Sequence, residues 1–340
     1  MKVSDFDYQL PSELIAQTPL AQRSNSRLLV LDKKTNTLSH DYFYNIKVYL
    51  KPHDVLVLND TKVLPARLYG KKSDTQAKIE LLILKEITKD VYSCLVKPAK
   101  RLKEGSKLNF SDKLSSIVIK KLADGICHVK FIYQGIFVEL LQELGQMPLP
   151  PYIHEKLIDQ DRYQTVYAKV NGSAAAPTAG LHFTQDLLQE LKEMDIKIIY
   201  ITLHVGLGTF RPVSVENVEE HIMHSEYYEL NAETANILND AKQKARRIIS
   251  VGTTTTRVLE ANLNKYQKFT ATKEETAIFI YPGYHFQAID GLITNFHLPR
   301  SSLLMLVSAF ATRESILKAY EEAIACNYRF FSFGDAMFIK

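Results

Sequence analysis

The sequence has few cysteines and no long hydrophobic run, and both absences limit what the protein can be. Its cysteines, Cys94, Cys127 and Cys326, are odd in number, far apart and without a CxxC pair. This pattern argues against a disulfide framework and against a cysteine metal site, and it fits a reducing cytoplasm. The longest apolar stretch, SSLLMLVSAFA, is too short to cross a bilayer, and MKVSDFDYQLPSELIAQ has no apolar leader segment. We expect a soluble, cytoplasmic protein with SSLLMLVSAFA as a buried core helix.

The charge is only mildly positive. The formal net charge is +4 and the isoelectric point is about 8.7, so a polyanionic partner is permitted but not required. Residues 71–150 contain 14 Lys and Arg against 9 Asp and Glu, which is +5 and leaves −1 for the other residues. This basic segment indicates either a docking surface for a nucleic-acid backbone or lysines that keep a barrel soluble.

The hydrophobic pattern divides the chain into two kinds of structure. After a short capped helix from Ser12, the runs RLLVL and DVLVLND predict strands at the edge of a mixed sheet. Between residues 70 and 145, the runs AKIELLILKEI, VYSCLVK, KLSSIVIKK and GICHVKFIY have the spacing of a small barrel, and a helix is expected at IFVELLQEL.

The remainder of the chain alternates between strand and helix patterns. Strands are predicted at KIIYITLHV, RIISVG, TAIFIY and GLITNF, and helices at TQDLLQELKEM, AETANILNDAKQKARR and ESILKAYEEAIA. The fold class predicted is an α/β (α+β) main domain built from both chain ends, residues 1–69 and 146–340, with a small basic β-barrel domain, residues 70–145, inserted into it.

Several polar loops follow the predicted strands. In ITLHVGLGTFRPV, a strand ends at His204, Gly206 and Gly208, but Arg211 replaces the third glycine of a dinucleotide fingerprint and no helix follows. These glycines indicate either a close approach of the backbone to a ligand or a tight turn. In LITNFHLPRSS, another strand ends at Asn295 and His297, where α/β folds place their sites.

Two further segments combine small residues with a helix start. In VGTTTTRVLE, Thr253 and Thr254 precede a helix and indicate an anion or ribose site, or an ordinary helix cap. In GSAAAPTAGLHFT, Thr178, Gly180 and His182 lie in a loop with almost no large side chains. Our hypothesis is that a nucleoside lies against this backbone.

Long motifs spread over nearly the whole chain carry a family resemblance. They include RSNSRLLVLD, LVLNDTKVLPARLYG, MPLPPYI, GSAAAPTAGLHFT, TLHVGLGTFRPV, VGTTTTRVLE, YPGYHFQAIDGLITNFHLPRSS and YRFFSFGDAMFI. In content and order they resemble the S-adenosylmethionine:tRNA ribosyltransferase-isomerase family of queuosine biosynthesis. The resemblance implies an α/β domain with an inserted barrel.

The resemblance also implies a reaction. The ribosyl part of S-adenosylmethionine is transferred to 7-aminomethyl-7-deazaguanine at the wobble position of a tRNA and isomerised, which gives epoxyqueuosine and releases adenine and methionine. S-adenosylmethionine is then a substrate, and no cofactor or metal is expected. The resemblance further implies a monomer that does not bind a membrane and has no obligate protein partner.

Such a reaction needs two or three acid/base groups, because protons move at the 5′ carbon, the adenine and the attacking amine. His182, His204 and His297 are the first candidates, since histidine titrates near neutrality. For each, a purely structural role is the alternative. Asp60 and Asp290 are candidates for holding a histidine tautomer or the sugar hydroxyls, or else they cap turns.

Substrate contacts are assigned by side-chain type. Arg67, Arg211 and Arg257 are candidates for the methionine carboxylate or a tRNA phosphate, or they pair with carboxylates of the protein. Tyr281 and Tyr284 flank a Pro-Gly turn and are candidates for stacking on a flipped-out base, or they pack the sheet edge.

Three alternatives stay open. The segment HIMHSE is expected to place His221 and His224 on one helical face with Glu226 nearby, which is loosely metal-like, but a helical zinc motif with two histidines usually needs the i, i+4 spacing and a third ligand. A different S-adenosylmethionine enzyme, such as a methyltransferase, conflicts with the missing nucleotide fingerprint. A non-catalytic RNA-binding protein built around the basic barrel leaves the histidine loops unexplained.

Overall fold

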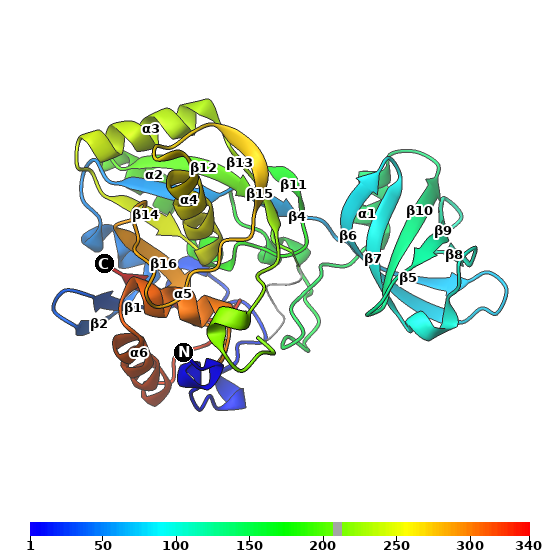
Figure 1. The fold of residues 1–340 in the computed structure, drawn as a ribbon, viewed down its shortest axis with the longest axis horizontal. Helices are drawn as coiled ribbons and strands as arrows, with labels where there is room; N and C mark the ends of the chain where they lie inside the picture. Colours follow the sequence, from blue (N-terminus) through cyan, green and yellow to red (C-terminus); the bar gives the residue numbers. More distant parts are fainter. Residues whose placement is uncertain (207–212) are drawn as a thin grey trace. The chain divides into compact units, whose positions relative to one another are not determined.

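The structure is a computed structural model in which residues 1–206 and 213–340 are described (Figure 1). The chain forms two compact units. The first comprises Met1–Thr61, Pro151–Val170 and Ala176–Lys340, and the second comprises Lys62–Pro150 and Asn171–Ala175. The predicted fold class is confirmed, since a large mixed α/β unit is accompanied by a small closed barrel. The domain limits at residues 69 and 146 remain our proposal.

A nine-stranded sheet organises the first unit. Its order is β15-β13-β12-β3-β14-β16-β17-β1-β2, and the central strands β12, β3, β14 and β16 are mutually parallel. The strands are β15 (Thr272–Thr276), β13 (Glu226–Leu230), β12 (Lys197–Leu203), β3 (Val55–Asn59), β14 (Ile248–Val251), β16 (Gly291–Asn295), β17 (Ala336–Ile339), β1 (Arg27–Asp32) and β2 (Thr37–Tyr42).

The middle of this sheet is buried on both faces. Every residue of β3, β14 and β16 is buried, which explains their continuous apolar sequences and the absence of polar alternation. One face is covered by α2 (Gln185–Glu193), whose Leu187, Leu188 and Leu191 join the core formed with the strand residues. Thr184 caps this helix by accepting a hydrogen bond from the N–H of Leu187 at 3.1 Å.

The other long helices are α3 (Ala232–Gln243), α4 (Thr253–Tyr266), α5 (Ser302–Phe310) and α6 (Arg313–Ala325). Most of the side chains of α5 are buried, which confirms the predicted core helix. Within residues 1–206 and 213–340, no helix has both the length and the apolar character needed to span a membrane.

The second unit contains a closed barrel in the order β10-β7-β6-β5-β8-β9. Alternate residues of β10, among them Cys127, Val129 and Phe131, point into its core. Phe137 of the helix α1 contacts the ring of Phe131, with centroids 5.0 Å apart. The elements are β5 (Arg67–Lys72), β6 (Lys78–Thr88), β7 (Val91–Lys97), β8 (Lys107–Asn109), β9 (Leu114–Lys121), β10 (Ile126–Tyr133) and α1 (Phe137–Leu144). In addition, β4 (Thr61–Val63) pairs with β11 (Val170–Ser173).

Four local predictions were wrong. The helix from Ser12 is only a short 3₁₀ turn, Ser12–Leu14, without a side-chain cap. The run DVLVLND forms β3 in the middle of the sheet instead of at its edge. In TAIFIY, the strand β15 already ends at Thr276, and residues 277–281 lie outside any strand; of these five residues only Ile280 is buried. The histidines of HIMHSE are not on a helix.

Candidate functional site

The carboxyl ends of the four central parallel strands carry most of the polar residues that the sequence singles out. Asp60 follows β3, His204 follows β12, Thr253 follows β14 after one glycine, and Asn295 ends β16. Because these strands are parallel neighbours, their carboxyl ends meet at one edge of the sheet. Open α/β sheets bind ligands at this edge, so it is the candidate site.

His182 is held from both sides in the 3₁₀ helix η7 (Thr178–His182). Its Nδ1 is 2.7 Å from Ser26 Oγ, and its Nε2 is 3.0 Å from Asn295 Nδ2. An amide nitrogen only donates, so Nε2 accepts and Nδ1 carries the proton. Thr178 Oγ1 donates to Asn295 Oδ1 at 3.0 Å and fixes the orientation of the amide.

The electrostatic surroundings keep His182 neutral. Burial, with smaller contributions from Arg23 and Arg329, lowers the pKa of this histidine to about 3. With both nitrogens occupied and a low pKa, the imidazole is suited to holding Asn295 and η7 in place, and it is a weak base for proton transfer.

Gly180 has a packing explanation within the protein. A Cβ at this position would lie 2.0 Å from Tyr167 Oη and 2.9 Å from Thr165 Cγ2, so no larger residue fits. Its neighbour Ala179 lies beside Gly252 at the start of α4, where a Cβ on the glycine would be 3.8 Å from that of Ala179. The small residues therefore bring η7 against the start of α4.

His297 is also buried and hydrogen-bonded. Its ring Nε2 is 2.8 Å from Thr294 Oγ1. Its backbone N–H donates to Tyr320 Oη at 3.0 Å, and its backbone carbonyl accepts from Tyr8 Oη at 2.5 Å. Burial lowers the pKa of His297 to about 3. These contacts fit a structural role for this histidine at the end of β16.

His204 differs from the other two histidines because it is only partly buried. Its Nδ1 is 2.8 Å from Thr61 Oγ1, and its ring stacks on Tyr227 with centroids 5.9 Å apart. Among the described residues, no hydrogen bond occupies Nε2. Burial lowers the pKa of His204, and the charge of Glu229 opposes that shift. Of the three candidates, His204 has the geometry of a group that exchanges protons with a ligand.

Asp60 lies next to Thr61, the hydrogen-bond partner of His204. Its Oδ1 accepts a hydrogen bond from Thr202 Oγ1 at 2.6 Å, and its backbone carbonyl accepts from Lys169 and Val170. Burial raises the pKa of the Asp60 carboxyl, although the Thr202 hydroxyl and Lys169 oppose the shift. The carboxyl is thus brought to the same edge as His204.

Asp290 lies elsewhere. It precedes β16, at the end of the strand opposite Asn295, and its Oδ2 accepts a hydrogen bond from the N–H of Ile248 at 2.8 Å. Its own N–H donates to the Ile248 carbonyl at 2.8 Å. The structure therefore uses Asp290 to join β14 and β16 and does not bring it to the candidate site.

The four threonines form the first turn of α4 and have two different roles. Thr255 Oγ1 donates to the Val251 carbonyl at 2.8 Å, and Thr256 Oγ1 donates to Ser250 Oγ at 2.9 Å, so both hydroxyls are used internally. The side chains of Thr253 and Thr254 make no hydrogen bond to any described residue. Together with the N–H groups of the first helical turn, these two hydroxyls are the candidates for an anion or hydroxyl site beside η7.

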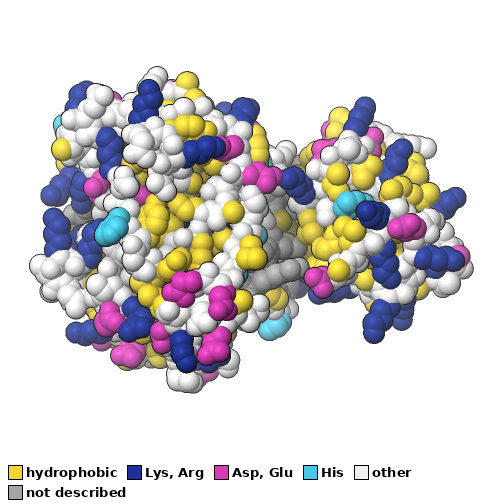
Figure 2. Space-filling model, viewed as in Figure 1, with side chains coloured by type: hydrophobic (Ala, Val, Ile, Leu, Met, Phe, Trp, Pro, Cys, Tyr) yellow, Lys and Arg dark blue, Asp and Glu magenta, His cyan; other side chains and the backbone are white. Residues whose placement is uncertain are grey.

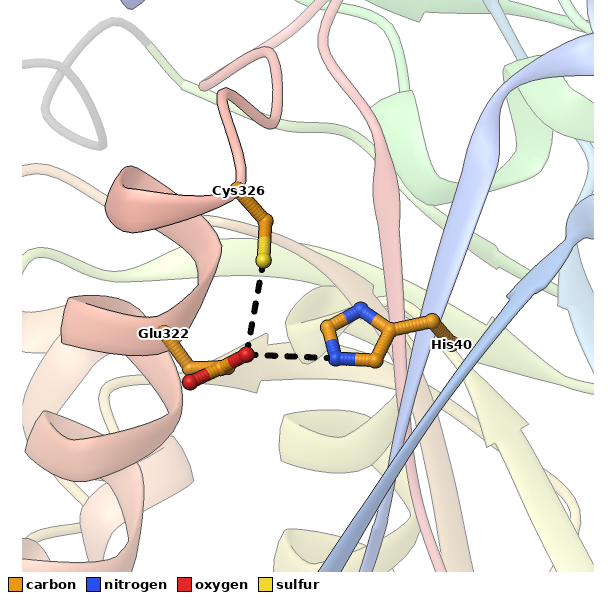
Figure 3. A group of neighbouring side chains, drawn as sticks. All are labelled: His40, Glu322 and Cys326. Atoms are coloured by element: carbon orange, nitrogen blue, oxygen red, sulfur yellow. Dashed lines mark hydrogen bonds and ion pairs between the residues drawn. The ribbon is translucent and has the colours of Figure 1, made fainter.

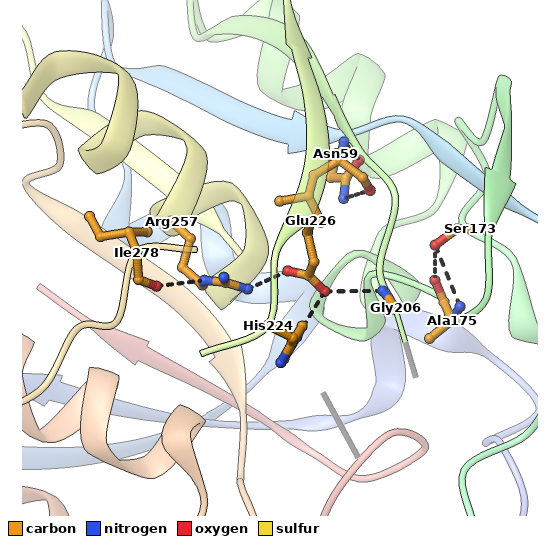
Figure 4. A network of polar contacts seen from close by, with 9 residues as sticks. Asn59, Ser173, Ala175, Gly206, His224, Glu226, Arg257 and Ile278 are labelled. Carbon is orange, nitrogen blue, oxygen red and sulfur yellow. Dashed lines mark hydrogen bonds and ion pairs between the residues drawn. The ribbon is translucent and has the colours of Figure 1, made fainter. Parts of the chain in front are cut away.

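Arg257 has its charge neutralised inside the protein (Figure 4). It forms a buried ion pair with Glu226, and its Nε donates to the Ile278 carbonyl at 3.2 Å. Glu226 also accepts from the N–H of Gly206 at 3.0 Å and lies 3.4 Å from His224 Nε2. Burial opposes ionisation of Glu226, but His224 and Arg257 outweigh it and lower the pKa. The network fixes the backbone at Gly206, just beyond the end of β12 at Leu203.

The remaining candidates have partners in the protein as well. Arg67 lies in the second unit, with Nε 3.3 Å from Glu80 Oε1. Tyr284 Oη donates to Glu260 Oε2 at 3.1 Å, and Tyr281 packs on Phe279 with centroids 5.0 Å apart. Gly208 and Arg211 lie outside the described residues.

Several residues that build this edge were not predicted from the sequence. Ser26 binds His182 from a segment distant in sequence, and no local signal marks it. Glu226 and Glu260 are buried carboxylates; Glu260 accepts from the N–H groups of residues 287–289 and anchors the turn after Pro282 to α4. The helical segment TTTTRVLEANLNKY has many other polar residues, so the sequence gives no signal that singles out Glu260.

Known proteins similar to this chain agree on one family. The model of the queuosine biosynthesis protein family matches residues 3–339. S-adenosylmethionine:tRNA ribosyltransferase-isomerases of Staphylococcus aureus and Staphylococcus epidermidis are 58% identical over 340 residues, which cover 100% of each chain. The crystal structure of S-adenosylmethionine tRNA ribosyltransferase from Thermotoga maritima is 38% identical, covers 99% of this chain and 100% of that chain, and has a TM-score of 0.58. The chain is therefore an enzyme that belongs to the queuosine biosynthesis protein family.

Proposed function

We propose that this enzyme transfers and isomerises the ribosyl part of S-adenosylmethionine onto 7-aminomethyl-7-deazaguanine at the wobble position of a tRNA, which gives epoxyqueuosine-tRNA and releases adenine and methionine. The observation that carries the proposal is the 58% identity, over the full length, to relatives named S-adenosylmethionine:tRNA ribosyltransferase-isomerase. S-adenosylmethionine serves as the ribosyl donor, no further cofactor takes part, and the enzyme acts as a cytoplasmic monomer.

His204 is the acid/base group that we assign to this reaction. A proton must leave the 5′ carbon next to the sulfonium, and the attacking amine must lose a proton. His204 supports this role because it is partly exposed at the carboxyl edge and its Nδ1 is oriented by Thr61. The raised pKa of Asp60, which is caused by burial, suits a carboxyl that holds or accepts a proton beside it.

The start of α4 is the part of the site that we assign to the adenosyl substrate. Thr253, Thr254 and the first N–H groups of the helix offer donors to ribose hydroxyls or to the methionine carboxylate. The backbone of η7 lies against this helix start at Ala179 and Gly252. His182 and Asn295 position η7, while His297 supports the end of β16.

Product analysis tests the proposal against its two rivals. Purified protein is incubated with S-adenosylmethionine and tRNA bearing 7-aminomethyl-7-deazaguanine, and both the small molecules and the digested nucleosides are followed by mass spectrometry. We expect free adenine and epoxyqueuosine nucleoside in equal amounts. S-adenosylhomocysteine with a methylated nucleoside would instead identify a methyltransferase. Binding of tRNA by folded protein without either product would favour a non-catalytic RNA-binding protein.

A further inference from the structure

A histidine, a glutamate and a cysteine meet on the first unit outside the candidate site (Figure 3). His40 lies on the edge strand β2, Glu322 lies on the last turns of α6, and Cys326 caps the end of that helix. Their ligand atoms lie within 4.8 Å of one another. The cluster joins two elements that are far apart in the sequence.

Two of the three separations match the edges of a tetrahedral metal site, and the third, between His40 and Cys326, is within 4.8 Å. His40 Nε2 is 3.4 Å from Glu322 Oε1, and Cys326 Sγ is 3.3 Å from the same oxygen. Zinc bonds of about 2.0 to 2.3 Å at tetrahedral angles place neighbouring ligand atoms about 3.3 to 3.7 Å apart. Nitrogen, oxygen and sulfur from these three residue types form a donor set that suits zinc.

The surroundings hold the three ligands in position. His40 Nδ1 is 2.8 Å from Tyr328 Oη, and this contact leaves Nε2 directed at Glu322. Arg27 Nη1 donates to the Cys326 carbonyl at 2.6 Å, and the Arg27 guanidinium lies 3.7 Å from the centre of the Tyr328 ring. The contacts of Tyr328 and Arg27 therefore hold the ring of His40 and the backbone of Cys326 in position.

Solvent reaches the cluster from outside. The side chains of His40 and Glu322 are 39% and 44% exposed, so a metal ion can enter and a water molecule can fill a fourth position. Three protein ligands and a water give a complete four-coordinate zinc shell.

We propose that His40, Glu322 and Cys326 form a zinc site that ties the edge strand β2 to the end of α6. On binding, the thiol proton that Cys326 donates to Glu322 leaves to solvent, and the thiolate sulfur, the glutamate oxygen and the neutral His40 Nε2 become ligands. No electron is transferred. The site stabilises the fold and takes no part in the ribosyl transfer.

Cobalt(II) is the probe that tests the proposal, because a thiolate ligand gives it a charge-transfer absorption band. One sample of the full-length protein is freed of metal with a chelator and titrated with cobalt(II). A second sample is loaded with zinc and dialysed, and the zinc that it retains is measured. We expect one equivalent of either ion, the thiolate band, and a higher melting temperature with zinc. Cys326→Ser and His40→Gln are expected to lose the band, and Tyr328→Phe to weaken cobalt binding about tenfold.

His53→Gln is the matched control, because His53 is also an exposed histidine next to an acidic residue, with its Nδ1 2.6 Å from Asp195 Oδ2, but has no cysteine partner in that pair. This variant should keep the band. The proposal is overturned if the wild-type protein shows no thiolate band and retains no zinc, or if Cys326→Ser keeps the band. Circular dichroism of each variant establishes that the loss of metal is not a loss of fold.

Discussion

Gly180 shows how a single missing side chain shapes the loop around His182. The hydroxyl of Tyr167 lies where a Cβ would be, and it is buried without a hydrogen-bond partner among the described residues. The sequence suggested that a nucleoside keeps this loop small. At Gly180, packing against Tyr167 and Thr165 already accounts for the glycine, whereas contact of the loop with a nucleoside remains a prediction.

Gly180→Ala should therefore destabilise the protein by about 1–3 kcal/mol, because the new methyl group overlaps Tyr167. Chemical denaturation measures this loss. Tyr167→Phe removes the atom that lies 2.0 Å away and should restore part of the stability in the double variant. Equal stability of Gly180→Ala and the wild-type protein would show that the packing explanation is wrong.

His182 makes a prediction about acid stability. In the folded protein its pKa is about 3, whereas the ordinary value is 6.5. The unfolded chain therefore binds a proton that the folded protein rejects, so stability is complete above pH 6.5 and falls as the pH drops toward 3. One such proton changes the free energy of unfolding by about 1.4 kcal/mol per pH unit.

Denaturant titrations between pH 6 and pH 4 measure this slope in the wild-type protein and in His182→Gln. The slope should be smaller by about one proton in the variant. His285→Gln, at an exposed position, shows whether removal of any histidine has the same effect. Identical slopes for wild type and His182→Gln would contradict a neutral, buried His182.

At the scale of the element, the four consecutive threonines in the first turn of α4 have two different roles: Thr255 and Thr256 bond within the fold, and Thr253 and Thr254 are candidates for binding the substrate. Thr253→Val and Thr254→Val remove hydroxyls that form no hydrogen bond to a described residue. We expect them to raise the KM for S-adenosylmethionine about tenfold, the effect of losing roughly one hydrogen bond, with little change in stability. Thr256→Val is the control: it removes the bond to Ser250 and should lower stability instead.

Steady-state kinetics and thermal melts on the same preparations separate these effects. The assignment fails if Thr253→Val and Thr254→Val leave every kinetic constant unchanged. A fall in melting temperature for these two variants as large as that of Thr256→Val would likewise assign all of the hydroxyls to the fold.

Most elements were predictable because each has a strong local pattern. The buried runs of β3, β14 and β16 are continuous apolar segments bounded by polar loops, and the strand order places those loops together. The end of β15 was not predictable, because Phe279 and Ile280 look like strand residues, but Phe279 packs on Tyr281 and Ile280 is buried without either residue pairing in the sheet. Hydrophobic periodicity records burial, and burial does not require sheet pairing.

The partners of the site residues were much less predictable than their positions. The pairing of His182 with Ser26 joins residues that are 156 positions apart in the sequence. The ion pair between Arg257 and Glu226 depends on the order of the strands in the sheet. Neither pairing leaves a local signal. The sequence thus located the loops at the carboxyl edge, but it did not separate the partly exposed His204 from the buried His182 and His297.

At the scale of the whole molecule, the basic segment belongs to the barrel unit. Figure 2 shows Lys and Arg side chains interspersed with acidic and apolar ones over the visible face of this unit. An open groove of about 1060 Å³ on it is lined by Lys71, Lys78 and Lys97 together with the aromatic rings of Tyr69 and Phe110. This combination suits a nucleic-acid strand, although Glu80 and Asp112 also line the groove.

Replacing Lys71, Lys78 and Lys97 with Ser should weaken tRNA binding and leave the affinity for S-adenosylmethionine unchanged. The slope of log affinity against log salt should fall by about 2–3, because each lost phosphate contact removes about 0.7–0.9. Ser replacements at Lys113, Lys120 and Lys130, which do not line the groove, control for net charge. If the two triple variants bind tRNA equally, the groove is not the binding surface.

The turnover of His204→Gln tests most directly whether proton transfer takes place at the carboxyl edge of the sheet. Free adenine and epoxyqueuosine nucleoside are followed together under saturating S-adenosylmethionine and tRNA, with the wild-type protein and His285→Gln as references. We predict that His204→Gln binds both substrates but turns over about 10² to 10⁴ times more slowly. Turnover of His204→Gln equal to that of the wild type would contradict the assignment of proton transfer to the carboxyl edge of the sheet.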